Sequence, residues 1–513
     1  MPAPLYATDK EPCIPVLFLD GRQEYLGWRD VLLRAHTIED LALPVPPAAS
    51  AVLRVLVALT ARVTELDNPT MRAGEWAAQR RLQLQQPDGF DPDRVHAYFD
   101  RYIWDLYDPA RPFLQDPRLP EQCDKRAGVN KLVFGRPEGN NLAWLSPHAD
   151  TDPQPVPSER ALWHLLIHHY YGASGQCSAR TTTAGRQSGA KAGPLRSAVS
   201  FHPLGRTLYE TLLAGLPKPA DPWPDADDRC PWEEPLPDPD AAPPPVTSPG
   251  RLLTGRSRHA LLLVPSPDGR HATDAYVTWA TQTSLPAEDP YLIYRVDPSK
   301  PPATAYKART ADADRALWRD LDALLLAGDE GATRDEPYIQ RPAAFTTLND
   351  LPPELRTSLR VRVHGFDQDP KTINRTWYTA LTPPIWPWTQ EHDDAAAERF
   401  AACRKAAEKI GTLLEAVSKE AWRKTISPDR DGRERPKQTR RLPAWTRQAR
   451  TAYWPRAETT FWRLLDDPSR NPTTAFAADA ITALHTASAA AIAQYFDAAP
   501  AIADAVNRLR RAR

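Results

Sequence analysis

The sequence predicts an α+β fold, in which a large, loop-rich mixed domain over residues 1–384 is followed by a four-helix bundle over residues 385–513. In the longer part, apolar residues recur at both helical and alternating spacing, which predicts helices and strands together. The chain has 55 prolines against 22 glycines, and this balance favours long ordered loops. Prolines disappear from residue 389 to residue 424, where a helical period of apolar residues begins.

The first elements of the mixed domain are a strand and two helices. Residues 14–19 form an apolar run that ends at Asp20-Gly21, which predicts a strand entering a hairpin turn. Residues 48–64 carry apolar side chains at helical spacing, and Arg54 and Arg62 are expected to face water from this helix. Asp91 followed by Pro92 predicts the start of the next helix.

The rest of the mixed domain alternates loops with short elements. Glycine-rich stretches without periodicity predict loops, and an acidic stretch rich in proline predicts an exposed connector. In chain order, the expected elements are a loop over 119–151, a helix over 158–171, a glycine-punctuated loop over 172–195, the connector over 217–249, strands over 259–264, 274–280 and 359–366, and a helix over 311–325.

The C-terminal part is expected to consist of amphipathic helices with short connections. The expected helices span 389–424, 447–465, 473–496 and 501–513. Pro455 is expected to kink or break the second of them. Pro383, Pro384 and Pro387 predict a stiff hinge, so we expect the bundle to be separable from the mixed domain.

Composition limits the classes of function. The 64 basic residues oppose 65 acidic ones, for a net charge of -1, so a uniformly basic coat is excluded and any nucleic-acid face must be local. No apolar run reaches the roughly 18 residues of a membrane span, which predicts a cytoplasmic protein. The five cysteines are isolated and odd in number, which speaks against a disulfide framework or a structural zinc site.

Two segments are locally basic. From Arg160 to Tyr209 there is no acidic residue, and from Trp422 to Arg456 there are 11 basic residues against three acidic ones. Such charge can replace the counterions of a phosphate backbone, but a solvated loop has the same composition, so both interpretations stay open. The basic residues of the first segment are Arg160, Arg180, Arg186, Lys191, Arg196 and Arg206.

Motifs of known enzymes match the sequence poorly. Residues 185–191 lack the glycine spacing of a phosphate loop, and Lys191 is not followed by Ser or Thr. His164 and His168 are four residues apart, but the glutamate of a zinc-protease motif is absent. A metal-dependent phosphohydrolase that uses His164 with His168, or His392 with Asp393, is the alternative function. Core or surface histidines and an acidic helix start explain the same residues more simply.

Several short motifs follow one another along most of the chain. They are Glu11-Pro12-Cys13-Ile14-Pro15-Val16, Leu32-Leu33-Arg34-Ala35-His36, Asp40-Leu41-Ala42, Asp108-Pro109-Ala110-Arg111-Pro112-Phe113-Leu114-Gln115, Gly139-Asn140-Asn141, Leu208-Tyr209-Glu210-Thr211-Leu212-Leu213 and Ala316-Leu317-Trp318-Arg319-Asp320. In order and spacing, the sequence resembles the large subunit of the type I-E CRISPR Cascade complex, the CasA family. The stretch at 217–249 matches least, and Cys13 stands where the family usually has Trp.

This resemblance implies a non-enzymatic protein, without catalytic residues, metal or cofactor, that works inside a crRNA-guided antiviral surveillance complex. It implies crRNA, the other Cascade subunits, double-stranded target DNA and a separate helicase-nuclease as partners, and no membrane. The subunit would inspect the protospacer-adjacent motif, assist strand opening and present the target to the nuclease. A neutral chain suits this role, because guide pairing reads most of the target.

The resemblance also implies the residues that contact nucleic acid. A glycine loop over residues 185–193, a glutamine-bearing wedge hairpin and a docking segment for crRNA and a neighbouring subunit are expected. The implied residues are Gly185, Arg186, Gly189, Lys191 and Gly193 in the loop, Gln368 and Lys371 in the wedge, and Phe134, Asn140 and Asn141 in the docking segment. The family's basic finger aligns with residues 276–280, which contain no lysine, and the candidates nearby are Arg251, Arg256 and Arg258.

Overall fold

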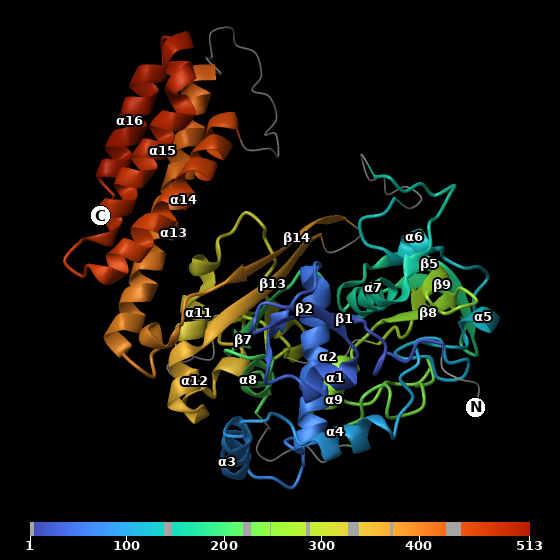
Figure 1. The fold of residues 1–513 in the computed structure, drawn as a ribbon. Coiled ribbons are helices and arrows are strands. Elements are labelled where there is room, and N and C mark those ends of the chain that lie inside the picture. The colour runs from blue at the N-terminus through green and yellow to red at the C-terminus, as the bar shows by residue number, and fades with distance from the viewer. Residues whose placement is uncertain are drawn as a thin grey trace. The chain divides into compact units, whose positions relative to one another are not determined.

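The computed structural model describes residues 5–137, 146–218, 227–246, 248–283, 288–326, 338–369, 373–426 and 443–512. The chain forms two compact units (Figure 1). The first comprises Met1–Asp314 and Gly328–Trp386, and the second comprises Arg315–Ala327 and Pro387–Arg513. The predicted fold class is confirmed, because the first unit mixes strands with helices and the C-terminal region is helical.

The first unit contains several small antiparallel sheets. Their strand orders are β2-β1-β3, β14-β13-β7, β4-β9-β8 and β11-β10-β12, and β5 and β6 form a separate hairpin. The strands are β1 (Ile14–Phe18), β2 (Gln23–Leu26), β3 (Ile38–Leu41), β4 (Val156–Pro157), β5 (Gly175–Thr182), β6 (Gly185–Ala190), β7 (Val199–Leu204), β8 (His259–Pro265), β9 (His271–Trp279), β10 (Tyr294–Val296), β11 (Tyr306–Ala308), β12 (Tyr338–Gln340), β13 (Arg360–Gln368) and β14 (Asn374–Leu381). The strands predicted from alternation are therefore present, whereas the loop predicted over 172–195 contains the β5–β6 hairpin.

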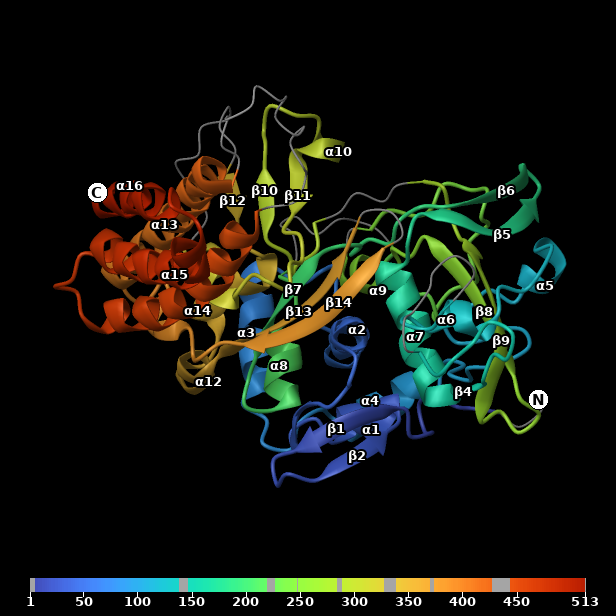
Figure 2. The same ribbon diagram turned by 90° about the horizontal axis from the view of Figure 1, so that it is seen from above.

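Helix α2 (Pro46–Thr64) is the core helix of the first unit, and it packs against α7 (Ser158–Tyr171), α8 (Leu208–Ala214) and α9 (Pro249–Thr254) (Figure 2). By length and composition, α2 and the bundle helix Pro472–Gln494 are each apolar enough to cross a membrane. The apolar window of α2 is 94% buried inside the protein, which is the environment of a core helix, and that of the bundle helix is 39% buried. The other helices of this unit are α1 (Trp28–Leu33), α3 (Ala73–Leu84), α4 (Pro92–Phe99), α5 (Leu119–Gln122), α6 (Val129–Leu132), α10 (Pro302–Ala305) and α12 (Pro353–Ser358).

Of the two arginines that were predicted to face water from α2, Arg54 is buried and Arg62 is half-buried. Arg54 is 0% exposed, and its Nη2 donates to Asp289 Oδ1 at 2.9 Å. The Arg62 side chain is 13% exposed and donates to Glu233. Burial lowers the pKa of Arg54, but the charge of Asp289 and of neighbouring groups outweighs this effect and raises the pKa overall. The prediction is wrong because α2 is covered on all sides, so none of its faces is left for water.

Residues 227–246, here called the strap, are packed into the first unit along their first half. Cys230 is fully buried and Trp232 is 4% exposed. Glu233 accepts hydrogen bonds from both Arg62 Nε and Nη2, at 2.9 and 3.0 Å. The prediction of an exposed connector is wrong for this half, because its acidic side chains are the counterions of partly buried arginines.

The second unit confirms the predicted C-terminal helices. They are α13 (Asp394–Ile426), α14 (Ala444–Asp466), α15 (Pro472–Gln494) and α16 (Ala498–Arg510), and α13 packs against each of the other three. Helix α14 continues through Pro455, where a kink or break was expected. A proline inside a helix costs about 3 kcal/mol, and packing on α13 and α15 offsets that cost.

The helix predicted over 311–325 is replaced by a 3-10 turn, η1 (Leu317–Asp320), and the short α11 (Asp322–Leu325). This segment belongs to the second unit. Arg319 Nε donates to Glu408 of α13 at 2.8 Å, and the Trp318 ring lies 4.5 Å from the Phe461 ring. A fragment that starts at residue 385 lacks these contacts, and the separability of residues 385–513 stays a prediction.

We expect Arg54→Met to lower the free energy of unfolding by about 3–5 kcal/mol, because it leaves the buried Asp289 carboxylate without its closest partner. Urea denaturation of the full chain measures this loss. Arg206→Met is the matched control, because the Arg206 side chain is 60% exposed and pairs with Glu210 at the surface. The control should lose less than about 1 kcal/mol. Equal losses in the two variants would contradict the central role of the buried charge.

Candidate functional site

The C-terminal end of α7 is where the predicted functional segments meet. The last carbonyls of a helix have no hydrogen-bond partner inside the helix. In α7, Tyr170 O accepts from the backbone N–H of Leu195 at 2.8 Å. Tyr171 O accepts from Arg196 Nη1 at 3.1 Å and from Gln368 Nε2 at 3.3 Å. The donors follow the predicted glycine loop or belong to the predicted wedge hairpin, so α7 fastens both segments at one point.

Arg196 holds the turn end of the β13–β14 hairpin. Its side chain is 3% exposed. The guanidinium donates to Asp369 O at 3.1 Å, to Ile373 O at 3.3 Å and to Asn374 Oδ1 at 2.9 Å. Burial lowers the pKa of Arg196 to about 10, so the group stays charged at neutral pH. A cation at this position also interacts favourably with the dipole of α7.

Gln368 is the last residue of β13, beside the turn of this hairpin, and is 2% exposed. Its Oε1 accepts from the Ser197 N–H at 3.2 Å, and its Nε2 donates to Asn374 Oδ1 at 2.8 Å. The sequence suggested an amide at the hairpin tip; the structure places Gln368 at that end of the hairpin, but its amide points inward and serves an internal network. A contact with a base pair therefore requires these hydrogen bonds to exchange. Lys371 lies outside the described residues.

The predicted glycine loop is mostly the strand β6. A Cβ built on Gly185 or Gly189 would meet nothing within 4 Å, so the backbone is open to a large ligand at both positions. At Gly193 a Cβ would lie 2.6 Å from Tyr170 O, and its N–H donates to Gly172 O at 2.9 Å. Gly193 is thus required for close packing against the end of α7.

The basic residues of the acid-free segment do not form one surface. Arg186 is exposed and forms an ion pair with Asp124, and Lys191 is exposed. Arg180 is 0% exposed, and its Nη2 donates to Asp116 Oδ2 at 2.6 Å. Burial raises the pKa of Asp116, but hydrogen bonds and charge from Arg118 and Arg180 outweigh burial and lower the pKa overall. Arg186 and Lys191 are therefore the accessible charges of the β5–β6 region, and residues 427–442 of the second basic segment lie outside the described residues.

Phe134 packs on the same end of α7. Its ring lies 4.5 Å from the His168 ring and 5.7 Å from the Phe366 ring of β13. The docking segment that was predicted around Phe134 is thus joined to the wedge hairpin through an aromatic cluster. Asn140 and Asn141, the other predicted docking residues, lie outside the described residues.

The histidine pairs of the alternative function do not form a metal centre in the described part of the chain, where no group of three potential ligands is found. His168 Nε2 lies 3.1 Å from Leu132 O and donates to it. Burial lowers the pKa of His164 to about 3, so its ring is neutral. Asp393 Oδ1 accepts from the Ala396 N–H at 3.1 Å. This hydrogen bond caps the start of α13, as the interpretation of Asp393 as an acidic helix start expects.

The structure does not single out any of the three candidates for the basic finger. Arg251 and Arg256 are 8% and 9% exposed, and Arg251 Nη2 donates to Glu234 at 2.7 Å. Arg258 Nη2 donates to Gln282 O at 2.9 Å. All three candidates are thus committed to the interior or to a neighbouring loop.

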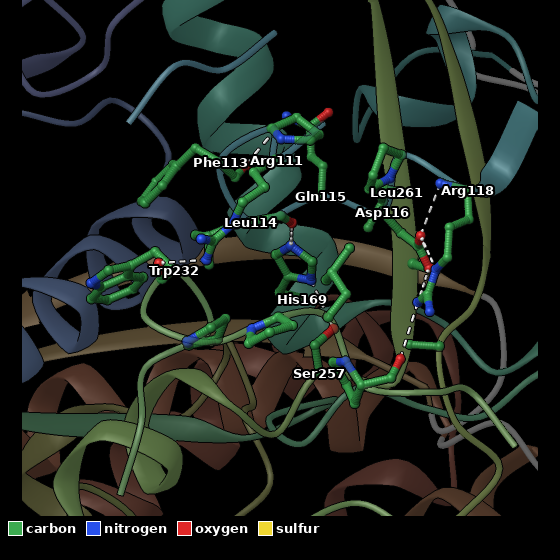
Figure 3. A pocket seen from close by; sticks show the side chains of 18 of the residues that line it. Arg111, Phe113, Leu114, Gln115, Asp116, Arg118, His169, Trp232, Ser257 and Leu261 are labelled. Atoms are coloured by element: carbon green, nitrogen blue, oxygen red, sulfur yellow. Dashed lines mark hydrogen bonds and ion pairs between the residues drawn. The ribbon is translucent and has the colours of Figure 1, made fainter. Parts of the chain in front are cut away.

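A cavity of about 470 Å³ lies between residues 111–118 and the strap (Figure 3). Arg111 Nη2 donates to Trp232 O at 3.2 Å, and Arg118 Nη2 donates to Pro237 O at 3.1 Å. His169 Nε2 donates to Leu114 O at 2.8 Å from the opposite wall, and burial lowers the His169 pKa to about 4. Arg111 and Arg118 thus hold the strap against the body of the unit, whereas His169 fixes the 111–118 segment.

Sequence reasoning missed the residues that join the site. Arg196 was counted as one of several bases, and Tyr171 and Asn374 were not singled out. Their positions in the sequence could have indicated these residues. Arg196 comes three residues after Gly193, and Tyr171 is the last residue of a strongly periodic helix. Several of their contacts join residues more than 170 positions apart in sequence, as the Arg196–Asp369 and Tyr171–Gln368 hydrogen bonds show.

Comparison with known proteins agrees with this architecture. The family model of CRISPR-associated protein Cse1 matches residues 10–495. The CRISPR-associated protein CasA/Cse1 of Thermus thermophilus is 27% identical over 431 residues, which are 82% of this chain and 78% of the relative. A chain of a solved CRISPR RNA-guided surveillance complex is 37% identical, with a TM-score of 0.83 over 98% of both chains. A crystal structure of CasA from Thermus thermophilus is 21% identical and shares the fold, with a TM-score of 0.74 over 98% of this chain and 99% of that one. Since the family model spans nearly the whole sequence, this chain belongs to the Cse1 (CasA) family of CRISPR-associated proteins.

Proposed function

We propose that this chain is the large, non-catalytic subunit of a crRNA-guided surveillance complex of the Cascade type. Membership of the Cse1 family and likeness to a chain of a CRISPR RNA-guided surveillance complex support this role. The proposed partners are crRNA, the other subunits of the complex, double-stranded target DNA and a separate helicase-nuclease. The subunit inspects the protospacer-adjacent motif, assists strand opening and presents the bound target to the nuclease.

The observation that carries the proposal is the junction of two hairpins at the end of α7. The β5–β6 hairpin presents Arg186 and Lys191 to solvent, as a contact with a phosphate backbone requires. The β13–β14 hairpin is held at its turn end by Arg196, which is itself bonded to α7. Inspection of a duplex and separation of its strands must occur a few base pairs apart. Two hairpins fastened to one helix end keep that spacing fixed.

The docking of crRNA is proposed at the segment around Phe134. Because this ring packs on His168 of α7 and on Phe366 of β13, the docking segment and the wedge hairpin share a support. A shift of the segment on crRNA binding would be transmitted to the hairpin through ring contacts.

The general role predicts an RNA-containing assembly. A tagged full-length chain, expressed with the neighbouring subunits of its own cell, should co-purify with short RNA of uniform 5′ sequence. Native mass spectrometry and sequencing of the bound RNA measure this. A single species near 57.3 kDa that carries no RNA would contradict the proposal.

We expect reversal of two charges, Arg186→Glu with Lys191→Glu, to weaken binding of duplex DNA to the assembled complex by about tenfold at low salt. The loss should shrink as salt rises, because these contacts replace released counterions. Fluorescence anisotropy across a salt series measures it. The control is Arg22→Glu with Arg206→Glu, which changes the net charge equally at side chains that are both 60% exposed. Equal weakening by the control pair would exclude a local contact.

We expect Gln368→Ala to impair opening of a fully paired target more than binding to a target already mismatched beside the motif. A wedge supplies part of the unstacking energy, which is on the order of a few kcal/mol per base step. Strand opening is followed with a 2-aminopurine reporter in the target. Asn374→Ala is the matched variant, since it removes a partner of the Gln368 amide but keeps the amide itself. Equal losses on both targets would show that Gln368 does not take part in opening.

A further inference from the structure

The turn that joins β5 to β6 gathers three hydrogen-bond donors around one carboxylate. Asp240 of the strap accepts from Thr182 Oγ1 at 2.7 Å, from Thr183 Oγ1 at 2.6 Å and from the Ala184 N–H at 3.0 Å. The three donors are consecutive in sequence, and Asp240 comes from a segment more than 50 residues away. The contact therefore fastens the middle of the strap to the hairpin.

This arrangement has the chemistry of an anion site. Hydroxyl groups and a backbone N–H at a turn are the donors that bind phosphate in loops of this kind. The backbone at Gly185 has a φ of +120°, a conformation that side chains rarely adopt, and nothing lies within 4 Å of the position of its missing Cβ. The turn is thus both shaped by glycine and open to a bulky anion. The hydrogen bonds from Thr183 and Thr182 lower the pKa of Asp240, so the occupant is ionised at neutral pH.

We propose that the β5–β6 turn is a phosphate-binding site that Asp240 occupies in the absence of nucleic acid, so that the strap and the backbone of duplex DNA compete for the same donors. A phosphodiester, like a carboxylate, presents two terminal oxygens that share one negative charge. It can therefore accept from the two hydroxyls and the N–H in the same way.

The neighbouring basic side chain, Arg186, is likewise paired with a carboxylate. Arg186, the second residue of β6, forms an ion pair with Asp124, and both side chains are about half exposed, at 63% and 45%. Surface ion pairs and exposed hydrogen bonds exchange readily with an incoming charged ligand. A row of phosphates that contacts the turn and Arg186 together would displace both Asp240 and Asp124. A single free anion would displace only one of these carboxylates.

Two parts of the strap differ in how firmly they are held. From Cys230 to Glu234 the strap is buried or half-buried and bonded to Arg62 and Arg251, whereas from Asp238 onward it is exposed or half-buried. Release of Asp240 would thus free the exposed part of the strap, while Cys230 to Glu234 before it and α9 after it stay in place. Pro237, which lines the cavity of Figure 3, lies at the border between the two parts of the strap.

The test compares Asp240→Ala with Asp227→Ala in the assembled complex. Asp227 is a strap acid with a 72% exposed side chain that pairs with Arg229, so both variants remove one negative charge from the same segment. We expect Asp240→Ala to tighten binding of a 30-base-pair duplex about three- to tenfold beyond the control, because the donors no longer have an internal occupant. Equal affinities of the two variants would overturn the proposal.

Two further measurements bear on the site itself. In the Asp240→Ala background, Thr183→Val should weaken DNA binding, because the ligand then loses a donor; an unchanged affinity would overturn the proposal. In the unmodified complex, hydrogen exchange of residues 236–246 should rise when the duplex is added. Slower exchange there would show that the strap does not leave the turn.

This inference rests on the proposed function, and the two can fail separately. If Arg186→Glu with Lys191→Glu leaves DNA affinity unchanged at low salt, contact of this hairpin with DNA is wrong. If that double variant weakens binding while Asp240→Ala equals Asp227→Ala, the hairpin contacts DNA and the competition by Asp240 is wrong. Melting temperatures of all variants, expected within a few degrees of the parent because these side chains are exposed, confirm that folding is intact.

Discussion

A guanidinium buried in the middle of α2 constrains the first unit. A buried charge must be met by acceptors on all sides, because an unpaired one costs several kcal/mol. Arg54 finds them in Asp289, in Ser50 Oγ at 2.5 Å and in Ser200 Oγ at 3.1 Å. These groups come from α2 itself, from β7 and from the segment before β10, so one side chain fixes a helix, a sheet and a loop against one another. Burial and the charge of Arg54 also lower the pKa of His202, so this neighbouring ring stays neutral and can accept from the guanidinium.

Tyr171 connects this core network to the candidate interface. Its hydroxyl donates to Ser50 Oγ at 3.2 Å, next to Arg54, and its carbonyl accepts from Arg196 and Gln368. Hydrogen bonds in a shared network strengthen one another. The position of the β13–β14 hairpin therefore depends on the hydrogen bonds of the core around Ser50 and Arg54. The same helix end explains why Gly193 cannot carry a side chain. The Tyr170 and Tyr171 carbonyls at the end of α7 thus have specific partners, while both hairpins keep exposed residues.

The acidic residues of the strap and its surroundings fall into two groups that pair with different partners. Acids at the inner end of the strap, such as Glu233 and Glu234, neutralise Arg62 and Arg251 and hold the strap in place. Acids at the surface, Asp124 and Asp240, instead lie on donors of the β5–β6 hairpin. In the proposed function, a chain that is as acidic as it is basic thus presents a nucleic-acid face without exposing a permanent basic patch. The strength of such a face depends on how easily its internal anions leave.

By itself, the sequence determined the most periodic elements and the family. Periodicity and start signals located α7 over 158–171 and the helices of the bundle, because both depend on residues a few positions apart. The motifs identified the Cse1 family, because their order survives where most residues differ. Only the tertiary structure decided what the polar residues do: Arg54 faces the core and not water, Gln368 points inward, and Asp240 closes the β5–β6 turn. Each of these outcomes depends on a partner 50 or more residues away, and a hydrogen bond between distant residues leaves no periodic trace in the chain.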